Sequence, residues 1–197
     1  MRAYFCGTRG STPVNGAEYP HYGGHTSCIG LAHAGEPPTV VLDAGTGLQR
    51  LSLVLDGQAF RGTLLLSHLH WDHTHGMPFF RSGALPGSRV DVYLPEQGVE
   101  PEELLARAIS PPHFPIRPKQ LGDGWTFNAL EPGHYAGLPS RSQSDFPRPG
   151  PDGTGVFHEA AITLTEGADL LDALVAQHAA APVRVFAAHD GMVVNLP

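Results

Sequence analysis

The stretch S-H-L-H-W-D-H-T-H-G, residues Ser67–Gly76, decides how this sequence is interpreted. Its H-x-H-x-D-H array consists of His68, His70, Asp72 and His73. Imidazole nitrogens and carboxylate oxygens are the ligands that zinc, manganese and iron accept in proteins. Residues 63–66 before the array are an apolar run, which predicts a buried strand. Because alternate residues of an extended segment point the same way, the first two histidines are able to bind one metal ion, and we expect a metal site at this strand end.

Length and composition limit the classes of protein to be considered. A chain of 197 residues fits one domain with its own core, and we expect residues 1–197 to form a single domain. The 24 glycines and 19 prolines predict a loop-rich fold, with an irregular loop over residues 140–155. A net charge of −7 with only 12 Lys and Arg residues argues against an extended nucleic-acid surface.

Cysteine content and hydropathy bear on location. The sequence shows no basic segment followed by an apolar signal region, and no run of 18 apolar residues. We therefore expect a cytoplasmic protein without a membrane segment. Cys6 and Cys28 lie in or beside predicted strands, and buried free thiols are the expected state of both.

The pattern of apolar residues predicts alternating strands and helices along the chain. Strands are expected at residues 2–6, 27–33, 39–43, 63–66, 89–94, 125–130, 183–187 and 192–196. Helices are expected at residues 46–55, 101–109 and 166–178, with a short helix at 74–80.

Three further side chains near predicted strand ends are candidates for a role beside the array. Asp43 ends a buried strand and precedes two glycines, so it either orients a metal ligand or caps a turn. His21 lies in a long Gly-rich loop, residues 7–24, and His25 directly follows this loop. Each either reaches a substrate or is a loop histidine that hydrogen-bonds to backbone.

Four segments of the sequence resemble the metallo-β-lactamase superfamily, and most closely its ribonuclease Z and small phosphodiesterase branch. The segments are G-T-R-G-S-T-P (Gly7–Pro13), Y-G-G-H-T-S-C (Tyr22–Cys28), L-D-A-G-T-G (Leu42–Gly47) and S-H-L-H-W-D-H-T-H-G-M-P-F-F (Ser67–Phe80). The likeness covers roughly residues 1–134 and resumes weakly at the C-terminal A-H-D-G-M-V-V. The resemblance implies an α+β fold, an αββα sandwich in which two mixed sheets face each other between outer helices.

The resemblance also assigns roles to individual residues. It implies that His68 and His70 bind a first metal ion, that Asp72 and His73 bind a second, and that His134 completes the first site. It implies one or two Zn²⁺ ions, with Mn²⁺ or Fe²⁺ as alternatives, and hydrolysis through a metal-bound hydroxide. Asp72 is the catalytic candidate, because it is placed to orient the nucleophile or accept its proton.

The sequence departs from the family pattern after His134, where its C-terminal half is shortened or divergent. The family supplies an aspartate that bridges both metals and a final histidine for the second metal. Neither has an evident counterpart here, and the open candidates are Asp145, Asp152, His158, Glu166 and His189.

Three functional hypotheses follow. The first is a metal-dependent hydrolase of small or cyclic phosphodiesters, with a small-molecule substrate. The second is a hydrolase of another ester type on the same fold, acting on a lactone, a thioester or a β-lactam, since fold alone does not set the substrate. The third is a degenerate, non-catalytic member with an incomplete second metal site. A homodimer is left open.

Overall fold

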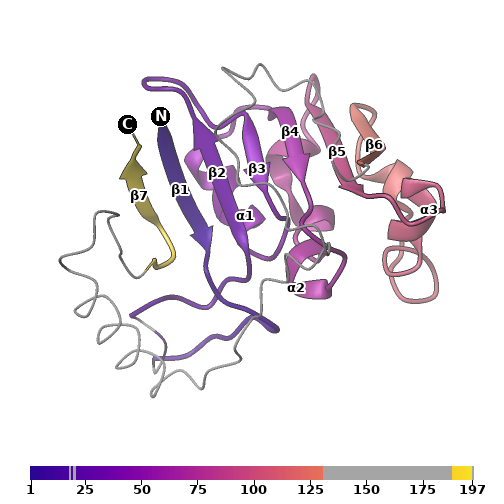
Figure 1. The fold of residues 1–197 in the computed structure, drawn as a ribbon, viewed down its shortest axis with the longest axis horizontal. Helices are drawn as coiled ribbons and strands as arrows, with labels where there is room; N and C mark the ends of the chain where they lie inside the picture. The colour runs from indigo at the N-terminus through magenta and orange to yellow at the C-terminus, as the bar shows by residue number, and fades with distance from the viewer. Residues whose placement is uncertain (18, 20, 131–187, 197) are drawn as a thin grey trace, which may run out of the picture.

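The computed structural model describes residues 1–17, 19, 21–130 and 188–196. This part of the chain is an α/β structure built on one mixed sheet of seven strands, with a few short helices (Figure 1). The strands are β1 (Arg2–Gly7), β2 (Cys28–Ala32), β3 (Val40–Leu42), β4 (Arg61–Leu65), β5 (Arg89–Pro95), β6 (Trp125–Leu130) and β7 (Met192–Asn195). The helices are α1 (Leu48–Val54), α2 (Trp71–Thr74) and α3 (Pro101–Ala106).

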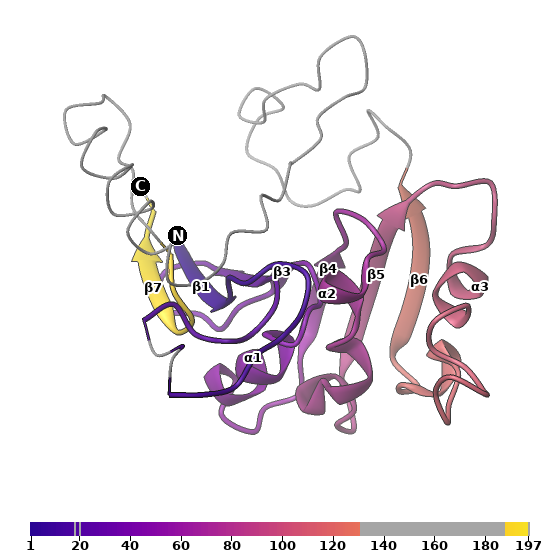
Figure 2. The same cartoon turned by 90° about the horizontal axis from the view of Figure 1, so that it is seen from below.

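The strand order in the sheet is β6-β5-β4-β3-β2-β1-β7. The pairs from β3 to β6 are parallel, and the pairs that join β3, β2, β1 and β7 are antiparallel. Parallel neighbours need crossover connections, and each of the three crossovers here contains a helix, namely α1, α2 or α3. Figure 2 shows α1 below the sheet and α3 beside β6.

One core cluster includes buried residues of β4, β5 and α1. Leu64 of β4 and Val92 of β5 are fully buried, as are Leu48 and Leu51 of α1. The buried leucines of α1 are three residues apart, and Leu53 on its opposite side is 75% exposed. This is the one-sided burial expected of a short helix that covers one face of a sheet.

The two ends of the described chain meet at one edge of the sheet. β7 pairs antiparallel with β1, and Arg2 lies opposite Asn195 in the register. The N-terminal amino group donates a hydrogen bond to the carbonyl oxygen of Leu196 over 3.2 Å. The C-terminal strand thus completes the sheet beside the first strand, as the termini in Figure 1 show.

Most of the expected elements are confirmed within the described residues. Ten of the twelve expected elements have a counterpart there, and the short helix expected at 74–80 is a 3-10 turn at Met77–Phe79. The helix expected over 101–109 ends earlier, at Ala106. The strand expected at 183–187, the helix at 166–178 and the loop at 140–155 lie outside the described residues.

The expectation of an αββα sandwich is tested only in part. The described residues contain one sheet, so the second sheet of the expected αββα sandwich is not among them. Cys6 and Cys28 are both free and buried, as expected, and burial raises the pKa of the Cys28 thiol. Within the described part of the chain, no helix combines the length and hydropathy needed to cross a bilayer.

Candidate metal centre

The candidate site lies where two parallel strands end. β3 and β4 are paired so that Leu42 lies opposite Leu65, and their carboxyl ends therefore reach the same edge of the sheet. Asp43 follows β3, and its backbone N–H donates to the carbonyl of Leu65 over 2.8 Å. The array follows β4 after two further residues, Leu66 and Ser67. The sheet register alone thus brings Asp43 beside the array, at the strand ends where open α/β sheets bind ligands.

A single helical turn orients the second half of the array. α2 begins at Trp71, and the N–H of His73 donates to the carbonyl of His70 over 3.0 Å. Asp72 and His73 are each 5% exposed, whereas Trp71 is 66% exposed. The helical turn that begins at Trp71 thus directs the side chains of Asp72 and His73 inward.

The structure brings the three histidines of the array together. The ring centroids of His68 and His73 are 4.0 Å apart, and those of His68 and His70 are 4.4 Å apart. The Oγ atom of Ser67 lies 3.0 Å from Nδ1 of His68. Three imidazoles therefore share one small volume at the strand end, as the i, i+2 spacing predicts for the first two.

Asp43 connects β3 to the array through both of its carboxylate oxygens. Oδ1 accepts hydrogen bonds from the backbone N–H and the hydroxyl of Ser67, both over 2.8 Å. Oδ2 lies 2.8 Å from Nδ1 of His73 and accepts from the hydroxyl of Ser27 over 3.2 Å. Of the two interpretations of Asp43, its contacts favour the one in which it orients the array.

His73 lies between two carboxylates. Its Nδ1 faces Asp43, and its Nε2 lies 3.3 Å from Oδ2 of Asp72. If Nδ1 carries the single proton of a neutral imidazole, the lone pair of Nε2 points at an anionic oxygen. A second proton or a metal ion next to Nε2 removes that repulsion. When a histidine binds a metal ion through one ring nitrogen, its other ring nitrogen commonly donates a hydrogen bond to a carboxylate, as Nδ1 of His73 is placed to do with Asp43.

Two pKa shifts describe the electrostatics of this edge. Burial by itself would raise the pKa of Asp43, but hydrogen bonds from His73 and Ser67 hold that pKa below its usual value. Burial and the neighbouring charges of His73 and His70 lower the pKa of His68. A carboxylate that stays ionised and an imidazole that stays neutral are the protonation states in which these groups support or bind a metal ion.

Two glycines allow the Leu42–Gly47 segment to pack directly on the array. A Cβ atom at Gly45 would lie 2.1 Å from the carbonyl oxygen of Asp72. A Cβ atom at Gly76 would lie 1.9 Å from the carbonyl oxygen of Gly45. No side chain fits at either contact. This explains why the sequence has a glycine two residues after Asp43 and another at the end of the Ser67–Gly76 stretch.

The donor chemistry of the array fits a divalent metal ion, because it combines neutral imidazole, carboxylate and a carboxylate-supported histidine. In the described residues, however, no group of three or more His, Cys, Asp or Glu side chains is arranged so that it could hold an ion as it stands. His134 lies outside the described residues, as do Asp145, Asp152, His158 and Glu166. His189 is described and exposed, with its Nδ1 3.2 Å from the carbonyl oxygen of Asp190.

Sequence reasoning missed one contact to the array from the N-terminal loop. The backbone N–H of Ser11 donates to Oδ2 of Asp72 over 2.7 Å. Ser11 has a φ of 64°, a left-handed conformation that is uncommon for a residue other than glycine. A backbone donor leaves no signal in the side-chain pattern, so only the G-T-R-G-S-T-P motif pointed to this loop.

Asp190, also missed, fastens this loop to the C-terminal segment. Its Oδ1 accepts from the backbone N–H and the hydroxyl of Thr8, over 3.1 and 3.3 Å. Its Oδ2 accepts from the backbone N–H of His25 over 2.9 Å. One carboxylate thus accepts three hydrogen bonds from two residues, Thr8 and His25, which lie 182 and 165 residues before it.

We expect the Asp190→Asn variant to unfold about 1–3 kcal/mol more easily than the wild type. The amide oxygen still accepts from Thr8, but the amide nitrogen then faces the N–H of His25, and two donors oppose each other. Urea denaturation followed by circular dichroism measures the difference. Asp123→Asn, a change at an exposed aspartate, is the matched control and should unfold like the wild type; equal stability of the two variants would contradict the role of Asp190.

Comparison of the sequence with models of protein families finds no matching family, and comparison with curated proteins finds no match either. The resemblance to the metallo-β-lactamase superfamily therefore stays an expectation that rests on the four motifs.

Proposed function

We propose that this protein is a metal-dependent hydrolase of small or cyclic phosphodiesters. His73 lies between Asp43 and Asp72 at the shared end of two parallel strands, and its ring centroid is 4.0 Å from that of His68. This position of His73 is the observation that carries the proposal. The proposal includes the αββα sandwich, of which the seven-stranded sheet would be one of the two sheets.

The array residues would hold the metal, most simply zinc, with His68 and His70 on a first ion and Asp72 and His73 on a second. When bound, a divalent ion lowers the pKa of water and polarises a phosphoryl oxygen. Asp43 keeps the proton of His73 on Nδ1, which leaves Nε2 as the nitrogen with a lone pair. Ser11 holds one oxygen of Asp72, whose carboxylate then has a fixed orientation towards a nucleophile.

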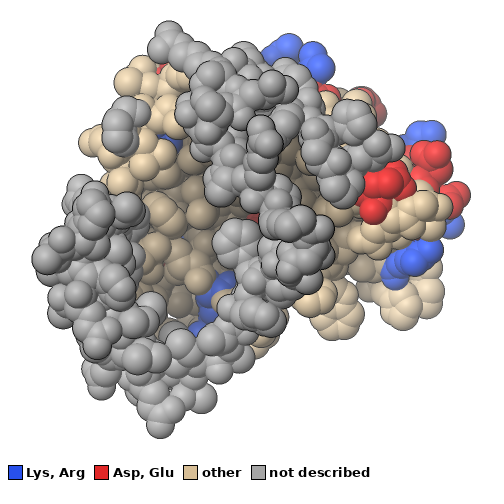
Figure 3. Space-filling view, viewed as in Figure 1, with Lys and Arg blue, Asp and Glu red and all other residues tan. Residues whose placement is uncertain are grey.

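The preference for a small phosphodiester over a long nucleic acid rests on charge and on the motifs. The chain carries a net charge of −7. On the face shown in Figure 3, basic and acidic side chains alternate at the α3 end of the molecule and do not form one basic surface. A polyanionic strand would need clustered Lys and Arg along its path, whereas one phosphodiester needs only the metal and a few donors.

A non-catalytic binding protein is the second candidate, and a specific observation favours it. Within the described part of the chain, no group of three or more His, Cys, Asp or Glu side chains is arranged to hold an ion, and the carboxylate that reaches the array from another segment, Asp43, is engaged by His73 and Ser67. A chain of this kind would bind one ion or none and would lack the charge stabilisation that two ions provide.

The test is the metal content of the full chain together with its activity. The protein would be purified, stripped with chelator, reloaded with Zn²⁺, Mn²⁺ or Fe²⁺ and analysed by mass spectrometry for bound metal. Hydrolysis of bis(p-nitrophenyl) phosphate would then be compared with hydrolysis of a lactone, a thioester and a β-lactam. We expect metal-dependent turnover of the phosphodiester that chelator abolishes.

Each other outcome selects a different function. Turnover of a lactone, thioester or β-lactam without turnover of the phosphodiester would assign the chain to another ester class. One bound ion or none, without turnover of any of these substrates, would identify the non-catalytic protein. Either result would overturn the proposed phosphodiesterase activity.

A further inference from the structure

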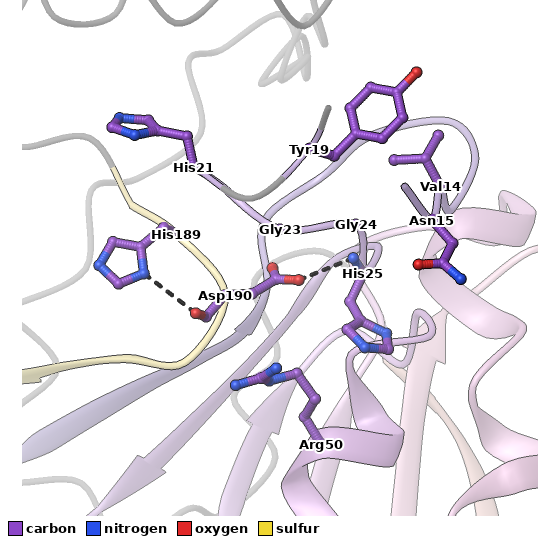
Figure 4. A pocket seen from close by; sticks show the side chains of 10 residues that line it. All are labelled: Val14, Asn15, Tyr19, His21, Gly23, Gly24, His25, Arg50, His189 and Asp190. Carbon is purple, nitrogen blue, oxygen red and sulfur yellow. Dashed lines mark hydrogen bonds between the residues drawn. The ribbon is translucent and has the colours of Figure 1, made fainter. Parts of the chain in front are cut away.

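A second site lies on the other side of the N-terminal loop from the array. A cavity of about 580 Å³ opens between residues 14–15, 19 and 21–25 of the N-terminal loop, the start of α1 and residues 189–190 (Figure 4). Its volume lies within the range of small-molecule sites. Its polar lining consists of Tyr19, His21, His25, Arg50, His189 and Asp190. Figure 4 shows His21 and His189 on one side of it and Tyr19 on the other, with Arg50 below Asp190.

Among the described residues that line the cavity, Asp190 is the single acidic side chain, and its charge is already engaged. Its two oxygens accept hydrogen bonds from the backbone N–H groups of Thr8 and His25 and from the hydroxyl of Thr8. A carboxylate with several such donors is stabilised as an anion without a cationic partner. Each of the remaining polar side chains of the cavity wall is able to donate a hydrogen bond.

Arg50 contributes a half-buried positive charge to this wall. Its guanidinium packs on the backbone of Gly191, where a Cβ atom would lie 2.6 Å from Nη2. Among the described residues, Asp190 lies near Arg50 along the cavity wall, yet no ion pair joins the two within 4.0 Å. Among the described residues, Arg50 has no counter-ion within 4.0 Å, and a partly desolvated charge in that position is stabilised by an anion, which the cavity has room for.

We propose that this cavity binds a phosphate or phosphomonoester group. The planar guanidinium of Arg50 offers two parallel N–H donors that match two phosphate oxygens. The imidazoles of His21, His25 and His189 add N–H donors around the same space. The proposal is independent of the metal array, because none of these residues belongs to it.

The two sites are neighbours joined by one loop. Thr8 and His25 contact Asp190 at the cavity, and Ser11 contacts Asp72 at the array. Residues 8–11 thus run from one site to the other. A substrate that carries a second phosphate group could place it in the cavity while its diester lies at the array.

Nuclear magnetic resonance of the full chain tests the proposal with inorganic phosphate as the probe. Chelator is added first, so that phosphate has no metal ion to bind at the array. We expect saturable shifts of the ring signals of His21, His25 and His189, whereas the signals of His68 and His70 stay unchanged. Single histidine variants assign the signals.

Arg50→Gln should weaken phosphate binding by about tenfold or more, because a hydrogen bond to a charged group is lost. Arg107→Gln, at an exposed arginine after α3, is the matched control and should bind as the wild type does. If Arg50→Gln fails to fold, His21→Gln replaces it, since His21 is exposed on the loop and its change should weaken binding without unfolding the chain.

Three results would overturn the proposal: the absence of saturable shifts, equal phosphate affinities of the Arg50→Gln and Arg107→Gln variants, and shifts confined to the array histidines. Because the probe is inorganic phosphate and the protein is metal-free, each of these results is separate from a failure of the proposed hydrolase activity.

Discussion

Replacing His70 by alanine is expected to lower metal-dependent phosphodiester hydrolysis by about a thousandfold or more, while the folded structure persists. His70 is exposed, and its ring contacts that of His68 at 4.4 Å between centroids. Its loss therefore removes a proposed metal ligand without opening a cavity in the core. The free energy of unfolding of the metal-free chain should change by less than about 0.5 kcal/mol.

His75→Ala is the matched control, because it makes the same change five residues along the chain and outside the array. His75 is exposed, and its ring stacks on Trp71 with centroids 5.1 Å apart. We expect this variant to keep its zinc affinity and its turnover. The measurements are zinc affinity by competition with a coloured chelator and the rate with bis(p-nitrophenyl) phosphate. Equal losses in the two variants would show that His70 is not a ligand.

The strands and the array were predictable from sequence because their signals are local. The apolar run before Ser67 predicts β4. The sequence left two roles open for Asp43 after β3, orienting a metal ligand or capping a turn, and the structure shows its contact with His73. Parallel pairing of two consecutive strands then suffices to bring their carboxyl ends together. The helical turn α2 was not predicted, because four residues are too few to show a period.

The contacts that sequence reasoning missed are long-range or made by backbone atoms. Asp190 lies 182 residues from Thr8, and nothing in the local pattern of either residue predicts their pairing. The cavity wall combines Arg50 of α1 with His21 and His189, which come from three separate segments. Such a site depends on the complete sheet, in which β7 pairs with β1.

The Asp43→Asn variant is expected to bind zinc about 10–100-fold more weakly than the wild type, because it changes which nitrogen of His73 carries the proton. Asp43 has a φ of 60°, a conformation that asparagine also adopts readily, so the backbone tolerates the change. The amide oxygen replaces Oδ1 and accepts from Ser67. The amide nitrogen replaces Oδ2 and then donates to Nδ1 of His73, which moves the proton to Nε2.

The same variant has a predictable pH dependence. The pKa of Asp43 is lowered in the folded state, so its ionised form contributes stability above the pKa of an unfolded aspartate. That stability is lost as the pH falls through the lower, folded-state pKa. We expect the wild type to exceed Asp43→Asn in free energy of unfolding at neutral pH by about 1–3 kcal/mol, and the difference to shrink in acid.

Asp91→Asn separates a specific effect on the array from a general effect of losing a carboxylate. Asp91 pairs with Arg89 over 2.8 Å and accepts from Thr126 over 3.0 Å, and it lies in β5, outside the array. The Asp91→Asn variant should lose little stability, because an ion pair near the surface contributes little, and it should keep its zinc affinity. If Asp43→Asn binds zinc as tightly as Asp91→Asn does, the proton on Nδ1 of His73 does not control the metal site. A selective loss in Asp43→Asn would instead show that the carboxylate after β3 sets the form of the histidine that binds the ion.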